Sequence, residues 1–294
     1  MVLPPLFAHR LGRAYGPASS IPALERALVG ADGVETDACL TADEQLVLLH
    51  DPLLSVGTNL QGWAHQRSLD HIRHEGVLLD CHGRPTAERP LSLDDLLDAT
   101  PQEMPVQVDI KAHADPGLAA RTAQVLCERY RCTRQRRRIE VISFHSSACA
   151  VAAAHGFASR LVVFADYAPE ALATWAMRHG VSGVSVEHFL LTTRLAHVFR
   201  LAGLSVNTGT VNDAELLLRV VGAVGPDAVC SDRPAELRRE AGPLHEGAAA
   251  QEPDLPPGDR GQGTPVGAAS ASRGPFRPYI SHANRPAGMN MKAA

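Results

Sequence analysis

The chain has 294 residues, of which 45% are hydrophobic and only 4% aromatic, and its formal net charge is −4. This composition supplies enough apolar surface for one sizeable core, built mainly from Leu, Val, Ile and Ala. Acidic and basic residues are mixed along the chain, which argues against a nucleic-acid-binding protein, since such proteins usually present a basic face.

The N-terminal residues lack the basic start and the long apolar run of a signal peptide. No stretch reaches the roughly 18 consecutive apolar residues of a membrane span. The six cysteines form no C-x-x-C pair, and several lie in apolar runs, where a free thiol behaves as a small hydrophobic side chain. We therefore expect a reduced, cytoplasmic protein without a transmembrane segment.

Short β-rich runs alternate with amphipathic helical stretches along most of the chain. The predicted strands are Leu6–His9, Gly33–Leu40, Leu46–His50, Val106–Lys111, Ile139–Phe144, Leu161–Ala165, Gly183–Glu187, Ser205–Thr210 and Ala228–Asp232. The predicted helices include Ile21–Leu28, Leu118–Tyr130, Pro169–Arg178, Thr193–Ala202 and Ala214–Val221. Gly180, Gly203 and Gly225 follow helices as terminating glycines do, and Asp213 is placed to cap one. About eight βα units in roughly 240 residues favour a closed (β/α)8 TIM barrel of the α/β class over an open sheet.

Two segments depart from this alternation. Residues 51–105 form a long connection with one helix candidate, Leu93–Ala99. We interpret it as a small insertion at the C-terminal rim of the barrel, where active sites of this fold lie. Residues 243–294 are rich in Gly, Pro, Ala and Ser and have almost no apolar periodicity, so we expect a disordered tail after a barrel domain over residues 1–242. A binding role for the tail is the alternative.

One arginine-rich stretch precedes a predicted strand and contains Arg129, Arg131, Arg134, Arg136, Arg137 and Arg138. We interpret it as a solvated helix end and loop. The alternative is a patch for anionic lipid headgroups or phosphates, which would allow weak contact with a membrane surface.

Carboxylates recur at a spacing of two on two predicted strands. Glu35 and Asp37 point to one side of their strand, and Asp109 with Lys111 repeats this pattern on the next barrel strand. Buried carboxylates are unfavourable unless they are paired or bound to a cation. Three of them in a barrel mouth suit one hard divalent cation, Mg²⁺ or Ca²⁺. The alternative is that each carboxylate caps a loop.

Two histidines end predicted strands. His9 is followed by Arg10, and His50 by Asp51. A histidine at the C-terminal end of a barrel strand is a candidate for proton transfer near neutral pH, although a lone one is more often structural. Together with an arginine, a lysine and three carboxylates, the two histidines form a set typical of phosphoryl chemistry.

Taken together, these segments resemble the glycerophosphodiester phosphodiesterase family. The matching stretches run in the family's order over about residues 6–238: Ala8-His9-Arg10, Gly33-Val34-Glu35-Thr36-Asp37, Leu40-Thr41, Leu49-His50-Asp51, Val108-Asp109-Ile110-Lys111, Thr210-Val211-Asn212 and Ser231-Asp232-Arg233-Pro234. Each stretch alone is a weak signal, but together they are highly specific.

The resemblance implies a TIM barrel with a small insertion after the second strand. It implies metal binding by Glu35, Asp37 and Asp109, and it also implies the following roles for the remaining site residues: an acid/base pair of His9 and His50, and phosphate binding by Arg10 and Lys111. The implied substrate is a small-molecule phosphodiester, which is hydrolysed to sn-glycerol 3-phosphate and an alcohol such as choline or ethanolamine.

The chain departs from the family pattern at four places. Leu11 stands where the family has Gly after His-Arg, and residues 18–21 read Ala-Ser-Ser-Ile instead of Pro-Glu-Asn-Thr. Asp109 replaces a Glu, and Gly209 replaces a Trp of the substrate pocket. We infer a retained catalytic core with an altered pocket. Two alternatives stay open: a lysophospholipase D acting on lysophospholipids, and a non-catalytic barrel that binds a phosphorylated ligand.

Overall fold

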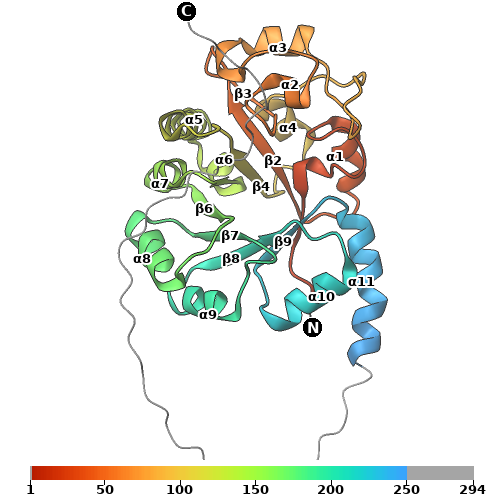
Figure 1. The fold of residues 1–294 in the computed structure, drawn as a ribbon, viewed down its shortest axis with the longest axis vertical. Coiled ribbons are helices and arrows are strands. Elements are labelled where there is room, and N and C mark those ends of the chain that lie inside the picture. Colours follow the sequence, from red (N-terminus) through yellow and green to blue (C-terminus); the bar gives the residue numbers. More distant parts are fainter. Residues whose placement is uncertain (1, 250–294) are drawn as a thin grey trace, which may run out of the picture. The chain divides into compact units, whose positions relative to one another are not determined.

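A computed structural model describes residues 2–249 of the chain, which form an eight-stranded parallel barrel surrounded by helices (Figure 1). The barrel strands are β1 (Leu6–Ala8), β2 (Gly33–Leu40), β4 (Val106–Ile110), β5 (Ile139–Ser143), β6 (Ala158–Val163), β7 (Gly183–Glu187), β8 (Ser205–Gly209) and β9 (Ala228–Ser231). They neighbour one another in chain order, and the parallel pairing of β1 with both β2 and β9 closes the cylinder. The predicted TIM barrel is confirmed.

The helices that cover the barrel follow the strands, as the alternating pattern predicts. They are α1 (Ile21–Ala27), α5 (Pro116–Arg129), α6 (Thr133–Arg138), α7 (Ser146–Ala154), α8 (Pro169–His179), α9 (Thr193–Leu201), α10 (Ala214–Ala223) and α11 (Pro234–Ala249). Local signals fix their ends: the Asp213 carboxylate accepts a hydrogen bond from the Leu216 amide at 2.8 Å and so caps α10. Gly180 ends α8 at a φ of +67°, a left-handed conformation that glycine adopts without strain.

The insertion after the second strand is present as a small layer of its own. It begins with β3 (Leu46–Val47), which pairs antiparallel with β2, and continues with α2 (Leu54–Gly57), the short 3-10 helix η2 (Ala64–Gln66), α3 (Leu69–Glu75) and α4 (Leu93–Ala99). Its apolar side chains form a separate cluster that includes Leu54, Ile72 and Leu78. The predicted strand Leu46–His50 is too long, because β3 ends at Val47 and His50 lies in an irregular segment.

The C-terminal helix α11 extends past the expected domain boundary at residue 242, up to Ala249. The rest of the segment predicted to be disordered lies outside the described residues. In the part of the chain that the structure describes, none of the helices combines the length and the apolarity required to cross a membrane. All six cysteines lie in this part and are free thiols.

Arginines of the basic stretch differ in environment. Arg138 is buried, which corrects the expectation of a solvated side chain. Its guanidinium donates hydrogen bonds to the carbonyl oxygens of Leu97 and Met104 at 3.0 Å each and to that of Thr100 at 3.3 Å. These acceptors lie at the end of α4 and in the connection to β4, so Arg138 fastens the insertion to the barrel.

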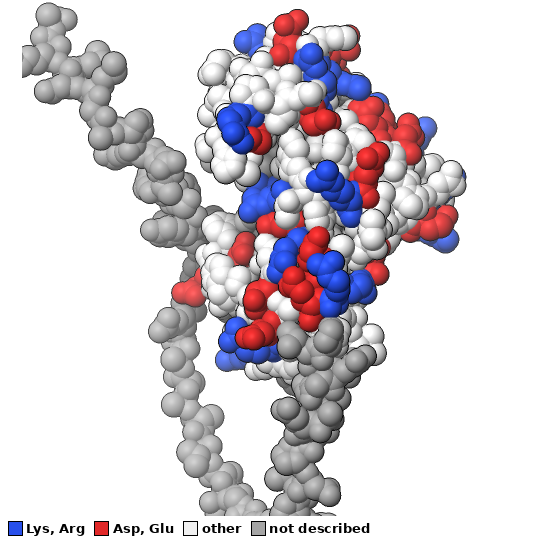
Figure 2. Space-filling view, turned by 90° about the vertical axis from the view of Figure 1, so that its right-hand side faces the viewer, with Lys and Arg blue, Asp and Glu red and all other residues white. Residues whose placement is uncertain are grey.

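Charges on the molecular surface are mixed in sign, as the sequence suggests. The face drawn in Figure 2 shows acidic and basic side chains side by side rather than a uniform basic area. The ion pair of Arg238 with Asp32 joins α11 to the segment before β2.

Polar contacts across the barrel show which side chains point inward. Cys230 on β9 contacts Gln107 on β4, and Arg160 on β6 donates to Ser205 on β8, although neither pair of strands is adjacent. These contacts therefore pass through the interior. Because side chains alternate along a strand, residues two or four positions further along point to the same side, at the C-terminal mouth. By this rule Asp109 on β4 points into the C-terminal mouth, and so do side chains of residues that follow the ends of β6 and β9.

Candidate active site

Three carboxylates from the adjacent strands β2 and β4 converge inside the barrel near its C-terminal mouth. Asp37 and Asp109 are opposite each other in the strand register, and Glu35 lies two positions before Asp37. Each of the three offers an oxygen within 4.8 Å of the others, and all three residues are buried, at most 5% exposed. The structure thus brings together the three residues that the spacing of the carboxylates singled out.

Two buried oxygens of the carboxylate cluster lack a hydrogen-bond donor among the described residues. Lys111 Nζ lies 2.6 Å from Asp109 Oδ2 and 3.1 Å from Asp37 Oδ1. The other two oxygens, Asp37 Oδ2 and Asp109 Oδ1, are buried without a hydrogen-bond donor among the residues that the structure describes. Arg10 Nε lies 3.5 Å from Asp37 Oδ2. Such unsatisfied buried oxygens fit a hard divalent cation, which the donor set of three carboxylates suits.

Burial and mutual repulsion shift the protonation of the cluster. Burial, reinforced by the charge of Asp37, raises the pKa of Glu35 to about 7. Burial and Asp37 also raise the pKa of Asp109. For Asp37 burial is the largest single effect and raises the pKa, but the positive charges around it together outweigh burial, so the pKa lies below the ordinary value. Those charges belong to Lys111, His50, Arg10 and His9. Glu35 therefore holds a proton for part of the time near neutral pH, and a bound cation would displace it.

His9 is oriented by the carboxylate of Asp232, which follows β9, the strand that pairs with β1 and closes the barrel. Its Nδ1 lies 2.6 Å from Asp232 Oδ1, and Asp232 Oδ2 accepts a hydrogen bond from Asn212 Nδ2 at 2.8 Å. Burial lowers the pKa of His9, but the hydrogen bond with Asp232 and the charge of Glu35 outweigh it, so the net shift is upward. The pairing of Nδ1 leaves Nε2 as the nitrogen available for proton transfer.

His50 has the same arrangement on the insertion side. Its Nδ1 lies 2.7 Å from Asp51 Oδ2, with the imidazole about one third exposed. The hydrogen bond from His50 is the main cause of the lowered pKa of Asp51. His50 also lies close enough to the cluster for its positive form to lower the pKa of Asp37 and of Asp109. Two histidines, each held through Nδ1 by a carboxylate, therefore flank the three acidic residues.

A left-handed turn after β1 positions Arg10. Arg10 and Leu11 have φ values of +49° and +61°, and the Arg10 amide donates to Glu35 Oε2 at 2.8 Å. Leu11 occupies the position where the family has glycine, and a leucine in this conformation costs about 1–2 kcal/mol. The Leu11 side chain is fully buried in the main core, and such burial contributes a similar amount, about 1.5–3 kcal/mol. The departure from glycine is thus offset by packing.

The other departures also have structural consequences. Ser19 is buried, its amide donates to the Arg10 carbonyl at 3.0 Å, and Ser20 caps α1. The Ser19 hydroxyl lies 3.2 Å from that of Thr36, which points to the side of β2 opposite Glu35 and Asp37. At Gly209, a Cβ atom would stand 2.7 Å from Cys230 Cβ. Cys230 therefore occupies space beside the position where the family has tryptophan.

Several residues around the histidines were not predicted as site residues. Asp51, Asn212 and Asp232 occur in the motifs that carry the family resemblance, but the sequence assigns them no role. Arg13 Nε, which lies 3.0 Å from Asp232 Oδ1, has no motif signal at all. A carboxylate directly after a histidine, as in His50-Asp51, was the signal that would have identified Asp51 as its partner.

The comparisons with known proteins identify the family of the chain. Residues 9–236 match the sequence model of the glycerophosphoryl diester phosphodiesterase family, which is most of the described chain. The chain belongs to the glycerophosphoryl diester phosphodiesterase family. The matched range begins at His9 and extends just past Asp232, so it includes every carboxylate and histidine of the cluster described above.

Sequence identity to individual family members is confined to a short part of the chain. The chain is 38% identical over 69 residues to a glycerophosphodiester phosphodiesterase from Caldanaerobacter subterraneus, covering 23% of this chain and 28% of that protein. It is 28% identical over 107 residues to one from Bacillus altitudinis, covering 36% of this chain and 44% of that protein. The chain thus aligns with less than half of the length of these two curated family members.

Solved structures match over a much larger part of the chain. A phosphodiesterase from Oleispira antarctica, in complex with the product sn-glycerol 3-phosphate, superposes with a TM-score of 0.68 at 22% identity, covering 81% of this chain and 96% of that chain. A glycerophosphodiester phosphodiesterase from Parabacteroides distasonis gives 0.65 at 23% identity, covering 83% and 98%. At these identities the two superpositions show the shared family fold.

Proposed function

We propose that this protein hydrolyses glycerophosphodiesters to sn-glycerol 3-phosphate and an alcohol, with one divalent cation at Glu35, Asp37 and Asp109. The observation that carries the proposal is the buried carboxylate cluster with two histidines beside it, each held by a carboxylate. Membership of the family supports the reaction class, and the product complex of the Oleispira antarctica protein supports the product.

The substrate phosphate is proposed to lie between the cationic side chains at the mouth. Arg10 and Lys111 both contact the carboxylate cluster, so a phosphate beside it meets two positive charges. A divalent cation, Mg²⁺ or Ca²⁺, would add polarisation of a non-bridging phosphate oxygen. Lys111 Nζ is proposed to donate to a second oxygen of the same phosphate, because an ammonium has three donors and Asp37 and Asp109 accept two of them.

The two histidines are proposed to transfer the protons. One histidine accepts the proton of the nucleophile, which is either a water molecule or the 2-hydroxyl of the glycerol. The other histidine donates a proton to the oxygen of the leaving alcohol. A phosphorus–oxygen bond forms on one side and the bond to the leaving group breaks on the other. Attack by the glycerol hydroxyl gives a cyclic phosphate, which water then opens. In both routes one water is consumed overall.

The proposal is tested by turnover of defined substrates by the metal-stripped protein. Glycerophosphocholine and glycerophosphoethanolamine are assayed for sn-glycerol 3-phosphate release, each without metal and with Mg²⁺, Ca²⁺ or Mn²⁺. Release that requires a divalent cation is the expected result. Metal binding without turnover of either substrate would overturn the proposal and favour a non-catalytic barrel that binds a phosphorylated ligand.

A further inference from the structure

Three exposed phenylalanines lie at the C-terminal rim of the barrel. Within residues 2–249 there are six phenylalanines, and three of them, Phe7, Phe157 and Phe199, are buried. The others are Phe144, Phe164 and Phe189, which are 39%, 50% and 70% exposed and follow the consecutive strands β5, β6 and β7. We call these three residues the phenylalanine rim.

The phenylalanine rim is continuous with the candidate active site. The Phe144 ring centroid lies 4.9 Å from Lys111 Nζ, the cation that contacts the carboxylate cluster. The Phe164 ring packs edge-on against Phe144 with their centroids 5.2 Å apart. The Tyr167 hydroxyl donates to the Leu190 carbonyl and so ties the loop that follows Phe164 to the loop that contains Phe189.

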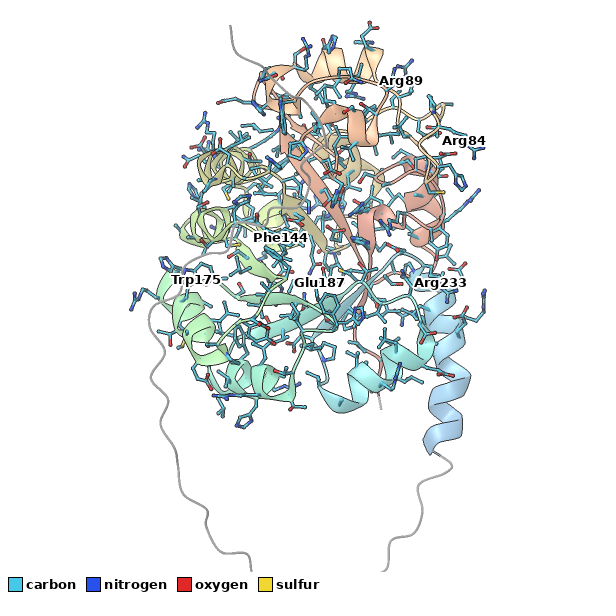
Figure 3. All side chains as sticks on the ribbon, viewed as in Figure 1. Arg84, Arg89, Phe144, Trp175, Glu187 and Arg233 are labelled. Carbon is cyan, nitrogen blue, oxygen red and sulfur yellow. The ribbon has the colours of Figure 1, made fainter. Side chains whose placement is uncertain are left out.

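The mouth of the barrel is thus divided by polarity. Strands β9, β1, β2 and β4 bring carboxylates, histidines and cations, whereas β5, β6 and β7 are followed by the phenylalanine rim, with one carboxylate, Glu187, at the end of β7. Figure 3 labels Phe144, which lies among the strands, and Trp175, which lies on the outer helix α8. Large aromatic side chains clustered in solvent indicate a surface that binds an apolar ligand. Because Phe144 contacts Lys111, a substrate whose phosphate binds Lys111 has its adjoining part next to Phe144.

We propose that the phenylalanine rim binds the hydrocarbon chain of an acylated substrate, so that lysophospholipids are preferred over glycerophosphodiesters. This inference rests on the proposed function, because the phosphodiester chemistry is unchanged: water and lysophosphatidylcholine give an acylglycerol phosphate and choline. Only the part of the substrate beyond the glycerol differs, and the phenylalanine rim contacts that part.

The test uses a series of substrates that share one leaving group. Choline release is measured with glycerophosphocholine and with hexanoyl and octanoyl lysophosphatidylcholine, kept below the concentrations at which they form micelles. We expect kcat/KM to rise with chain length, by about tenfold to the octanoyl compound, mainly through a lower KM. The double substitution Phe164→Ser and Phe189→Ser should remove most of that rise. Phe144 is left unchanged because it also contacts Lys111, which is proposed to bind the phosphate.

Leu201→Ser is the matched control. Leu201 is 76% exposed at the end of α9, away from the C-terminal mouth, so this variant should retain the whole chain-length effect. A chain-length effect that persists in the double variant would overturn the inference. So would a concentration-dependent dimer that the double variant loses, because a second copy of the chain would then cover the phenylalanine rim.

Failure of the inference can be separated from failure of the proposed function. If glycerophosphocholine is hydrolysed but the acylated compounds are not preferred, the inference is wrong and the proposed function stands. If no compound is hydrolysed, calorimetric binding of octanoyl-glycerol 3-phosphate is compared with that of sn-glycerol 3-phosphate. Tighter binding of the acylated compound that is lost in the double variant supports the inference, and equal binding overturns it.

Discussion

Nδ1 of His9 lies 2.6 Å from Oδ1 of Asp232, although 223 residues separate them along the chain. His9 directly follows β1 and Asp232 directly follows β9, the first and last strands of the barrel, which pair with each other. The closure of the barrel therefore creates the pair. Asp232 has a pKa lowered to about 2, because the hydrogen bond from His9 and the positive charges nearby outweigh burial.

Asp232→Asn should lower the pKa of His9, because the substitution removes the hydrogen-bonded charge that raises it. His9 has a raised pKa in the folded state, so its pairing stabilises the protein below about pH 6.5 and this contribution is lost as the pH rises through the folded pKa. The Asp232 contribution is lost as the pH falls below about 4. The stability difference between wild type and variant should therefore be largest between these two pH values.

Imidazole NMR titration and chemical denaturation at several pH values measure both effects. Asp213→Asn is the control, because asparagine caps a helix as well as aspartate does. An unchanged pKa of His9 in Asp232→Asn would show that the pair does not set the protonation of the histidine.

His9→Ala and His50→Ala should each lower kcat by about a hundredfold or more, since proton transfer typically contributes that amount. Divalent-metal binding should be retained in both variants, because the carboxylates are intact. The control is His71→Ala, an exposed residue of α3. Wild-type rates in both histidine variants, measured on a substrate that the protein hydrolyses, would refute the acid/base assignment.

Glu35→Gln should stabilise the metal-free protein at pH 8 and abolish stabilisation by metal. The pKa of Glu35 is raised to about 7, mainly by burial, so ionisation of this group destabilises the fold as the pH rises from about 4.5 through 7. Removing the charge should raise the free energy of unfolding by roughly 1–3 kcal/mol. In the wild type, Mg²⁺ or Ca²⁺ at a hundredfold of its dissociation constant should raise Tm by about 5–10 °C.

Thermal denaturation with and without metal at pH 6 and pH 8 measures these changes. The metal-induced rise in Tm should be smaller at pH 6, because protons compete for Glu35. Glu25→Gln, on the surface of α1, serves as the control. A metal-induced rise that is preserved in Glu35→Gln would show that Glu35 is not a ligand.

Arg138→Ala should destabilise the protein by about 3 kcal/mol or more. The variant leaves three carbonyl oxygens without their donor at the join between insertion and barrel. Arg137→Ala, one residue away and exposed, should change stability by less than about 0.5 kcal/mol. Urea denaturation of both variants provides the comparison, and equal stabilities would contradict the fastening role of Arg138.

The sequence by itself determined the barrel and most of its elements. The β-rich runs Gly33–Leu40 and Gly183–Glu187 predicted the bounds of β2 and β7 as the structure has them, because local strand propensity sets where these strands begin and end. The convergence of Glu35 and Asp37 was predictable, since residues two apart on a strand must point to the same side.

Only the tertiary structure decided which partners hold the histidines and which basic residues are buried. Asp232 reaches His9 because the barrel closes, and the closure joins segments from opposite ends of the chain. The sequence predicted Arg138 to be part of a solvated basic stretch, whereas in the folded protein carbonyl groups of the insertion and its connection to β4 accept its hydrogen bonds. The phenylalanine rim likewise depends on three loops that become neighbours only when β5, β6 and β7 pair. Contacts between distant segments leave no periodic signal in the sequence, and for that reason these features required the folded structure.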